Sequence, residues 1–417
     1  MPSVLPAETT VLVIGGGPVG LIASGLLSQA RIPNVVIERR KQTQRAPAAH
    51  VLRRRSMQIL AGLGVADEVR AAASPLALDY ITWCTTLGGS EIGRLELRPR
   101  DPSTGARPPE TWTNCPQNLL EPILLRRAVR EPLTRVVRGA ECFAIETRGA
   151  GVMVRVRLDD GSERELRASW AIAADGAGSS TRRALGIPLE GKGPLGRFLM
   201  VHFEADLTPW IAHRPGPIFW LMNPESPGTL IVHHPERSHV LMMPARSEND
   251  DAEQAAAPER LAKALGVPVP AKILSIDTWS PHVQVASRYR DGRVFLAGDA
   301  AHRFPPTGGL GLNTGIQEIH DLVARLARVI AANAEETLLD GYEAAFRPVA
   351  QANASESFEN MLRLGEIARA LGSYSELAAL EQRLASLTQA ERAALDAAIE
   401  AQRSHFESDG ASPDVSR

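Results

Sequence analysis

The sequence predicts an α/β fold in which a Rossmann-like nucleotide-binding domain is combined with a β-sheet domain and a helical C-terminal segment. Three observations support this prediction. An apolar run at residues 11–14 leads into a glycine-rich turn and then into a helical pattern, as in a nucleotide-binding βαβ unit. Two further apolar runs, at residues 170–174 and 293–297, lead into turns that carry an aspartate and a glycine. Residues 188–285 are rich in aromatic side chains and have little helical periodicity, which favours a separate sheet.

The glycine-rich turn has the spacing that dinucleotide binding requires. Gly15, Gly17 and Gly20 form G-x-G-x-x-G, with Pro18 and Val19 between the last two glycines. The first glycine allows a tight turn, the second lets a pyrophosphate approach the backbone, and the third allows the helix to pack closely on the strand. We therefore expect these five residues to build the phosphate end of a nucleotide site.

A second buried strand, at residues 35–37, ends at the acidic residue Glu38. A carboxylate about 20 residues after the glycines can accept both ribose hydroxyls, so FAD or NAD fits better than NADP. Residues 191–196 also match G-x-G-x-x-G, but Pro188 and Pro194 flank or interrupt them and no buried strand leads in. This second match is expected to be a loop.

The domain organisation follows from these changes of pattern along the chain. We expect the nucleotide-binding domain to be discontinuous, at residues 1–78, 112–187 and 286–340. Residues 79–111 and 188–285 are expected to form the β-sheet domain. Residues 341–406 are predicted to be helices, of which the last opens with a capping box, and the polar residues 407–417 are expected to be disordered.

Composition narrows the class of protein. The formal net charge is −2 in 417 residues, which gives no general electrostatic reason to expect a nucleic acid or membrane partner. No apolar run reaches the roughly 18 residues of a membrane span. Cys84, Cys115 and Cys142 are widely spaced and odd in number, which argues against a metal site and for a reducing, cytoplasmic location.

Two aspartates extend the predicted site beyond the glycine-rich turn. Asp175 and Asp299 each follow a buried strand next to a glycine. The carboxyl ends of parallel strands meet at one edge of a sheet, which is where ligands bind. One long ligand could then contact Glu38, Asp175 and Asp299 together.

These motifs resemble the three FAD fingerprints of the single-component FAD-dependent aromatic hydroxylases, which have the para-hydroxybenzoate hydroxylase fold. The matching segments are residues 15–20 with Glu38–Arg39, residues 174–182, and residues 293–313 (RVFLAGDAAHRFPPTGGLGLN). The resemblance implies an FAD-binding domain with a substrate-binding sheet domain. It also implies bound FAD, NADPH or NADH as a transient reductant, O2 as co-substrate, and a small aromatic substrate on a monomer or homodimer.

The resemblance assigns roles to individual residues. Asp299 matches the aspartate that holds the flavin ribityl chain, Glu38 the ribose carboxylate, and Asp175 the motif between FAD and NADPH. Pro305 and Pro306 match the segment beside the reactive face of the flavin. Further matches to cofactor-contacting positions are Arg39, Arg45, Gln117, Gly311, Leu312 and Asn313. Independently, a helix that begins near Gly311 would direct its positive end at the negative charge of reduced flavin.

The activity implied is an FAD-dependent, NAD(P)H-consuming monooxygenase that hydroxylates a phenolic or polycyclic aromatic compound through a flavin C4a-hydroperoxide. A general base that ionises a phenol would assist this reaction. His50 is favoured because it follows the flavin-contacting segment, and the other candidates are His213, His233, His234 and Tyr289. The apolar residues expected to line the substrate pocket, or otherwise to form sheet core, are Phe203, Phe219, Trp220, Met222 and Met242.

Two alternatives remain open from the sequence. The same FAD-binding frame carries Baeyer–Villiger oxidation or epoxidation, particularly of polyketides. A flavin-binding protein without turnover is a further reading, which the intact segment 305–313 disfavours. A flavin-dependent halogenase is disfavoured because no W-x-W-x-I-P segment is present.

Overall fold

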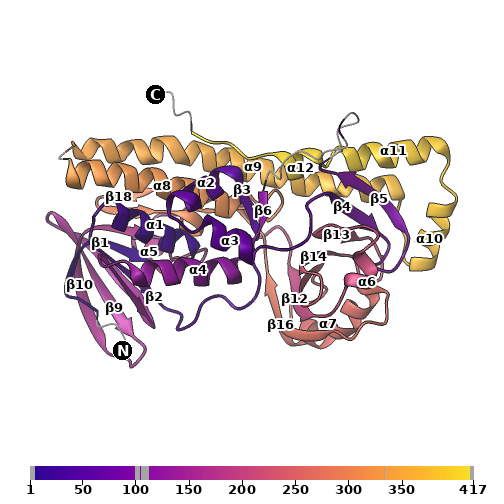
Figure 1. Cartoon of the computed structure of the whole chain (residues 1–417), viewed down its shortest axis with the longest axis horizontal. Coiled ribbons are helices and arrows are strands. Elements are labelled where there is room, and N and C mark those ends of the chain that lie inside the picture. Colours follow the sequence, from indigo (N-terminus) through magenta and orange to yellow (C-terminus); the bar gives the residue numbers. More distant parts are fainter. Residues whose placement is uncertain (1–4, 99–103, 105–111, 333, 414–417) are drawn as a thin grey trace.

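The computed structural model describes residues 5–98, 104, 112–332 and 334–413. Two β-sheets lie side by side, and long C-terminal helices run along one side of both (Figure 1). Of the segment 79–111, residues 99–103 and 105–111 lie outside the described residues.

The first sheet contains the predicted βαβ unit. Its strand order is β18-β19-β10-β1-β2-β7, and β8 and β9 extend it through β10. Strands β7, β2, β1, β10 and β19 run parallel to one another, and the apolar runs of β1, β2, β10 and β19 are buried on both faces as parallel strands require. The bounds of the strands are β1 Glu8–Ile14, β2 Asn34–Glu38, β7 Thr134–Arg138, β8 Ala140–Arg148, β9 Gly151–Leu158, β10 Glu163–Ala173, β18 Arg290–Asp291 and β19 Val294–Leu296.

Register brings the three sequence motifs to one edge of this sheet. Ile14 at the end of β1 pairs with Ala173 at the end of β10 on one side and with Ile37 of β2 on the other. Ala173 in turn pairs with Leu296 at the end of β19. The segments that follow these strands, at residues 15–20, 174–179 and 297–301, are therefore neighbours. The prediction of an α/β fold with a Rossmann-like domain is confirmed.

The second sheet has seven strands in the order β16-β12-β15-β14-β13-β4-β5. Its strands come from two separate parts of the chain. Strands β4 and β5 precede β6, and the other five strands follow β11, so part of the first sheet lies between them in sequence. The bounds are β4 Tyr80–Cys84, β5 Glu91–Glu96, β12 Phe198–Glu204, β13 Ile218–Leu221, β14 Gly228–His234, β15 Ser238–Pro244 and β16 Lys272–Trp279. Two small sheets pair β3 Val51–Arg53 with β6 Trp112–Asn114, and β17 Val283–Ala286 with β11 Leu189–Lys192 and β20 His302–Arg303.

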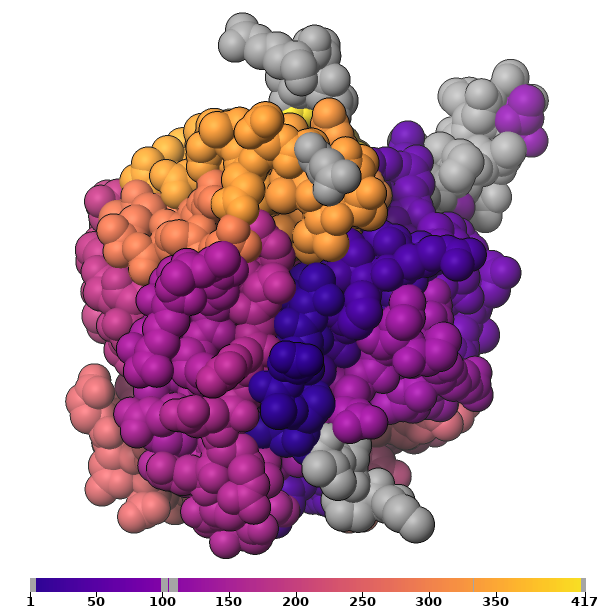
Figure 2. Space-filling model, turned by 90° about the vertical axis from the view of Figure 1, so that its left-hand side faces the viewer, coloured from indigo at the N-terminus to yellow at the C-terminus, as the bar shows by residue number. Residues whose placement is uncertain are grey.

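The helices of the first part of the chain pack on the first sheet, and α7 packs on the second. The C-terminal layer consists of α8 to α12. Figure 2 views the molecule from the end that holds the first sheet and shows this orange layer lying over the magenta and indigo segments. The helix bounds are α1 Pro18–Gln29, α2 Arg54–Gly62, α3 Ala66–Ala72, α4 Gln117–Arg130, α5 Ser180–Ala184, α6 Thr208–Ile211, α7 Asp250–Leu265, α8 Leu310–Ala331, α9 Asp340–Leu371, α10 Leu377–Ala385, α11 Gln389–Glu400 and α12 Arg403–Glu407, with 3-10 turns η1 Gly298–Ala300 and η2 Glu336–Leu339.

Two local expectations can be compared with the structure. The second G-x-G-x-x-G match, residues 191–196, starts in the short strand β11 and is followed by no helix, so it lacks the strand–turn–helix arrangement of a nucleotide site. The capping box that opens α11 is present, with the Thr388 side chain accepting from the Glu391 N–H group.

The expectation of disorder from residue 407 onward is wrong for residues 407–413. Glu407 belongs to α12, and the Ala411 N–H group donates a hydrogen bond of 2.6 Å to Asn353 Oδ1 in α9. A buried amide that accepts a backbone hydrogen bond holds this polar stretch in place, which composition alone does not reveal. Residues 414–417 lie outside the described residues.

Candidate functional site

Two cavities adjoin each other where the first sheet, the second sheet and the start of α8 meet. One of about 440 Å³ lies at the carboxyl edge of the first sheet and is called the edge cavity. The other, of about 400 Å³, lies between the start of α8 and the second sheet and is called the apolar cavity. Residues that line both are Ala49, Ala177, Asp299, Gly311 and Leu312. The two cavities therefore form one elongated site.

Most residues predicted to bind the cofactor lie around the edge cavity. Those in its wall are Gly15, Gly17, Pro18, Val19, Glu38, Arg39, Gln117, Asp175, Asp299, Gly311 and Leu312. Gly20 lies behind the wall, where an added Cβ would be 2.0 Å from the Gly15 carbonyl oxygen, so it serves the close packing of the turn on the helix. The exposed Arg45 donates to Gln42 and lines neither cavity, so its contact with the flavin stays a prediction.

The glycine-rich turn leaves room for a ligand at one position only. At Gly15, whose φ is +110°, an added Cβ would lie 2.2 Å from the Ala174 carbonyl oxygen, so the position requires glycine. At Gly17, an added Cβ would meet no protein atom within 4 Å. Gly17 lines the edge cavity at the N-cap of α1, and no side chain caps that helix. The space in front of Gly17 is suited to a phosphate group.

Glu38 is held in its ionised form at the end of β2. Gly16 and Arg40 each donate a backbone N–H hydrogen bond of 2.7 Å to its carboxylate, and the Arg40 guanidinium lies 3.2 Å away. Burial opposes ionisation, but these donors outweigh it and lower the pKa of Glu38. An ionised carboxylate at this position is a good acceptor for ribose hydroxyls.

The two aspartates have different surroundings. The Asp175 carboxylate accepts from Ser179 Oγ at 2.5 Å and from the Thr181 N–H group at 3.1 Å, so it shapes the turn before α5. The Asp299 side chain is accessible from the cavities although protein surrounds it. Burial raises the pKa of Asp299, and His302 and Arg303 partly oppose this effect.

A single amide fixes the start of α8. Asn313 is 1% exposed and turns its side chain away from both cavities. Its Oδ1 accepts from the Arg53 N–H group at 2.8 Å and from Ser56 Oγ at 2.6 Å, and its Nδ2 donates to the carbonyls of Val51 and Gly309 at 2.8 and 2.7 Å. The amide thereby uses two donors and two acceptor positions. The first turn of α8, which has no side-chain cap, is directed toward the junction of the cavities.

Behind Asp299 lies a fully buried pair, His302 and Glu318. Glu318 Oε2 accepts from His302 Nε2 and from the Gly298 N–H group, both at 3.0 Å. Burial alone would lower the pKa of His302, but Glu318 and, less strongly, Asp299 outweigh it and raise that pKa. The pair connects α8 to the turn that carries Asp299.

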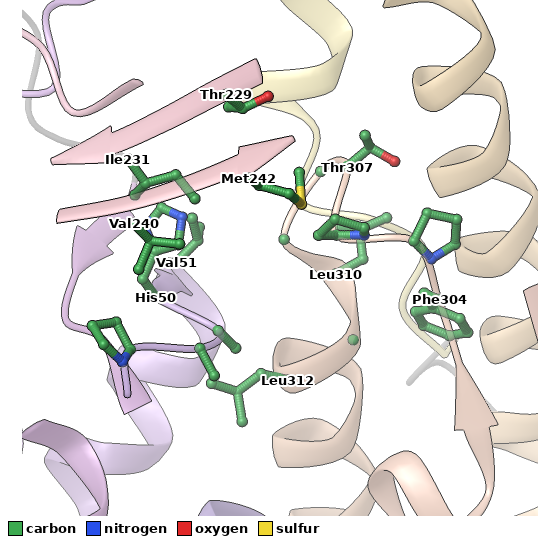
Figure 3. A pocket seen from close by; sticks show the side chains of 18 of the residues that line it. His50, Val51, Thr229, Ile231, Val240, Met242, Phe304, Thr307, Leu310 and Leu312 are labelled. Atoms are coloured by element: carbon green, nitrogen blue, oxygen red, sulfur yellow. The ribbon is translucent and has the colours of Figure 1, made fainter. Parts of the chain in front are cut away.

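One face of the second sheet forms a wall of the apolar cavity. Figure 3 shows Thr229, Ile231, Val240 and Met242 on the sheet, with Leu310 and Leu312 of α8 and with His50 and Val51 around the same space. Pro305 and Pro306, predicted beside the flavin, also line it. Trp220 and Met242 are in its wall as expected for substrate-contacting residues.

His50 is the best placed of the candidate bases. It lines the apolar cavity, and its Nδ1 lies 2.9 Å from Asn114 Oδ1, so we assign the proton to Nδ1 and the lone pair to Nε2. Burial lowers the pKa of His50 to about 4, and the hydrogen bond with Asn114 opposes this effect without outweighing it. His233 also lines the cavity, with its ring centroid 5.2 Å from that of His50, and burial lowers the pKa of His233 well below its usual value.

The structure excludes the other candidate bases from the cavity wall. Tyr289 is completely buried in the core of the first sheet beside Tyr342. His213 is exposed, and His234 lies at the end of β14 outside the wall.

Phe203 and Phe219 are wrong as substrate residues, whereas Met222 lies outside the cavity wall and its assignment stays a prediction. Phe203 and Phe219 are completely buried on the opposite face of the second sheet, in the core that packs on α7. Side chains alternate between faces along a strand, so Trp220 faces the cavity and its neighbour Phe219 cannot. Met222 follows the end of β13 and packs against the cluster shared with the C-terminal helices.

Several lining residues were not predicted. Those on the sheet point to the same face of the sheet as Trp220 and Met242. Because side chains alternate between the two faces along a strand, this alternation is the signal that could have identified them. They are Met200, Ile218, Thr229, Ile231 and Val240. Others come from segments distant in sequence, and no local pattern marks them: Arg53, Trp112, Trp279, Arg303, His405 and Phe406.

The elongated site fits FAD. The edge cavity offers a glycine backbone open to a pyrophosphate at Gly17 and an ionised carboxylate for the ribose at Glu38. The junction offers Asp299 and the uncapped start of α8 to the ribityl chain and the flavin ring. The apolar cavity beyond the junction is left for a substrate.

Comparison with known proteins gives the same result. A family model described as an FAD binding domain matches residues 8–357. The chain is 33% identical over 424 residues to 2,4-dichlorophenol 6-monooxygenase from Delftia acidovorans, covering 94% of this chain and 71% of that protein. It is 36% identical over 359 residues to a putative polyketide hydroxylase from Streptomyces halstedii, covering 83% of this chain and 64% of the relative.

A solved structure supports the likeness in three dimensions. The flavin-dependent monooxygenase PieE, in complex with FAD and substrate, superposes with a TM-score of 0.86 at 30% identity, covering 95% of this chain and 71% of the other. In the part of the chain that the structure describes, no helix has the length and apolarity needed to cross a membrane.

Substitution of Gly17 tests the phosphate end of the site. We expect Gly17→Ala to fold normally, because its φ of −77° suits alanine and no protein atom obstructs the Cβ. The methyl group would occupy the space of the pyrophosphate, so FAD affinity should fall about tenfold or more. The measurement is quenching of FAD fluorescence on titration of the apoprotein. Gly62→Ala, at another glycine with open space, is the matched control, and equal affinities in the two variants would contradict the assignment.

Substitution of Glu318 tests the pair behind Asp299. The pKa of His302 is higher in the folded protein than the value of about 6.5 expected in the unfolded chain, so protonation of His302 stabilises the fold. This stabilisation is complete below about pH 6.5. It is lost as the pH rises through the folded-state pKa. Glu318→Gln should therefore lower the free energy of unfolding by about 3 kcal/mol near pH 6 and by less near pH 9. Urea unfolding at both pH values measures this. Glu259→Gln, on the exposed face of α7, is the control, and a pH-independent loss in Glu318→Gln would refute the ion pair.

Proposed function

The chain belongs to the family of FAD-dependent aromatic hydroxylases and monooxygenases, and from this premise we propose that it hydroxylates a phenolic or polycyclic aromatic substrate with NADPH or NADH and O2. Bound FAD, once reduced, would supply the activation of O2, and one atom of O2 would pass to the substrate while the other leaves as water. The observation that carries the proposal is the continuity of the edge cavity with an apolar cavity through Asp299, Gly311 and Leu312.

The protein's own groups would position the two partners. Glu38, Gly17 and Asp299 would hold the cofactor along the sheet edge, and the start of α8 would stabilise negative charge on the reduced ring by about 1 kcal/mol or more. Thr229, Ile231, Val240 and Met242 would bury an aromatic ring and exclude water from it.

His50 would accept a hydrogen bond from the substrate hydroxyl at Nε2. Its depressed pKa keeps the imidazole neutral throughout the physiological range, so the acceptor lone pair is always available. A hydrogen bond from a phenol to this nitrogen increases electron density on the ring, which favours attack on an electrophilic oxygen. His233 lies at ring-contact distance and is a second acceptor in the same wall.

Oxygen-dependent oxidation of NADPH tests the proposed function directly. The FAD-loaded protein is mixed with NADPH or NADH in air, with and without a panel of phenols and polycyclic phenols. We expect at least one aromatic compound to accelerate oxidation several-fold, and its product to carry one additional oxygen atom by mass spectrometry. A lactone or epoxide would favour the Baeyer–Villiger or epoxidising alternative. Oxidation that no aromatic compound stimulates would oppose the proposal.

Substitution of His50 tests its assigned role through pH. His50→Ala should slow hydroxylation by roughly tenfold near pH 7, because it removes the acceptor of the hydrogen bond from the substrate hydroxyl. The effect should shrink as pH approaches the phenol's own pKa of about 10, because the substrate then ionises without help. The readout is the rate of product formation against pH, with His213→Ala as an exposed control. A profile parallel to that of the wild type would rule out the role.

A further inference from the structure

The turn that carries Asp299 is held by a carboxylate from α8. Glu318 Oε2 accepts a hydrogen bond of 3.0 Å from the Gly298 N–H group and another of 3.0 Å from His302 Nε2. Asp299 lies between these two donors in sequence, so one carboxylate oxygen holds the chain on both sides of it. Glu318 and His302 are completely buried, whereas Asp299 lines both cavities. Glu318 therefore contacts no ligand itself and acts on the cavities through the turn.

The same turn is enclosed between two helices. Gly298 has a φ of +60°, and a Cβ added to it would lie 3.1 Å from Val19 Cγ2 at the start of α1. A Cβ added to Gly315 of α8 would lie 3.1 Å from the Gly298 Cα atom. Both distances are shorter than the usual separation of packed carbon atoms. Contacts with α1 and α8 therefore determine where the turn lies relative to the sheet edge.

Stability alone does not account for an ion pair at this place. Loss of one partner from a buried pair is costly, but the pair as a whole contributes little compared with apolar side chains, because desolvation offsets the attraction. His302 Nδ1 is also buried with no hydrogen-bond partner among the described residues. A buried polar atom without a partner is a further cost. We therefore looked for an effect of the pair on Asp299.

The pair affects the charge of Asp299. Burial raises the pKa of Asp299, and the charged groups that act on it are His302 and Arg303 of β20, which lower it, and Glu318, which raises it least. Burial would also lower the pKa of His302, but Glu318 and Asp299 outweigh this effect and raise that pKa. The ionised form of Asp299 thus depends on a protonated His302, and the protonated His302 depends on Glu318.

We propose that Glu318 is a positioning residue for FAD, which acts through the turn at residues 298–302 on the carboxylate of Asp299. Glu318 fixes the turn through the Gly298 N–H group, and it keeps the Asp299 carboxylate ionised through His302. An ionised carboxylate would accept stronger hydrogen bonds from the ribityl hydroxyls than a protonated carboxyl group. The inference concerns the retention of FAD, so it holds or fails whatever substrate and reaction the protein has.

Titration of the apoprotein with FAD tests this inference, with quenching of flavin fluorescence as the measurement. Glu318→Gln keeps the size of the side chain and removes its charge, so the dissociation constant for FAD at pH 7 should rise about tenfold. Asp321→Asn, in the next turn of α8, also replaces a carboxylate with an amide, but it affects only the pair with Arg325 and should change affinity less than about twofold. Unchanged affinity in Glu318→Gln would overturn the inference.

A double-mutant cycle separates positioning from a general structural effect. In an Asp299→Ala background the carboxylate on which Glu318 acts is gone, so Glu318→Gln should change the FAD dissociation constant less than about twofold. A loss of about tenfold that persists in this background would overturn the inference. An Asp299→Ala variant with wild-type affinity would do the same, because Asp299 would then have no part in binding FAD.

The pH profile of FAD binding gives an independent readout. In Glu318→Gln, His302 loses its partner and its proton, so the pKa of Asp299 rises further. The loss of affinity relative to the wild type should therefore be greatest near pH 6 and shrink toward about pH 9, where Asp299 ionises without help. His302→Gln removes the same positive charge and should give the same profile, which provides the test if Glu318→Gln does not fold. A loss that is equal at both pH values would indicate a structural role and overturn the inference.

Discussion

The side chain of Asn313 is the interaction on which the geometry of the site depends. Its four hydrogen bonds join the adjacent elements β3 and α2 to the first turn of α8, which lies about 260 residues later in the sequence. The amide is buried, so loss of any partner would leave an unpaired polar group with no access to water. The position of the uncapped end of α8 relative to both cavities follows from this constraint.

Much of the fold could be predicted because buried parallel strands and glycine-rich turns leave strong local signals. The turn at Gly15 requires glycine through a contact with Ala174, and both residues follow strands whose apolar runs are visible in the sequence. The common direction of the strands in a parallel sheet then brings Glu38 and Asp299 to one edge of the sheet. This can be predicted without knowing how the side chains pack. The edge cavity was therefore foreseeable almost residue by residue.

The apolar cavity was less predictable for two physical reasons. Alternate residues of a strand point to opposite faces of the sheet, so a shift of one residue changes the face. An aromatic side chain such as Phe219 suits a hydrophobic core as well as a pocket, and the prediction from composition therefore assigned Phe219 to the wrong face. The cavity also gathers side chains from distant parts of the chain. Arg53 and His405 are separated by more than 350 positions, and each belongs to a short element whose neighbours are set only by tertiary packing.

The shared wall of the two cavities links their occupancies thermodynamically. Asp299, Gly311 and Leu312 face both spaces, so a ligand in the edge cavity becomes part of the surface that the second ligand meets. Linkage is reciprocal: if the first ligand improves the affinity for the second by some factor, the second must improve retention of the first by the same factor. An aromatic substrate with such positive coupling would then strengthen equilibrium binding of the cofactor, and loss of the cofactor would weaken binding of the substrate by the same factor.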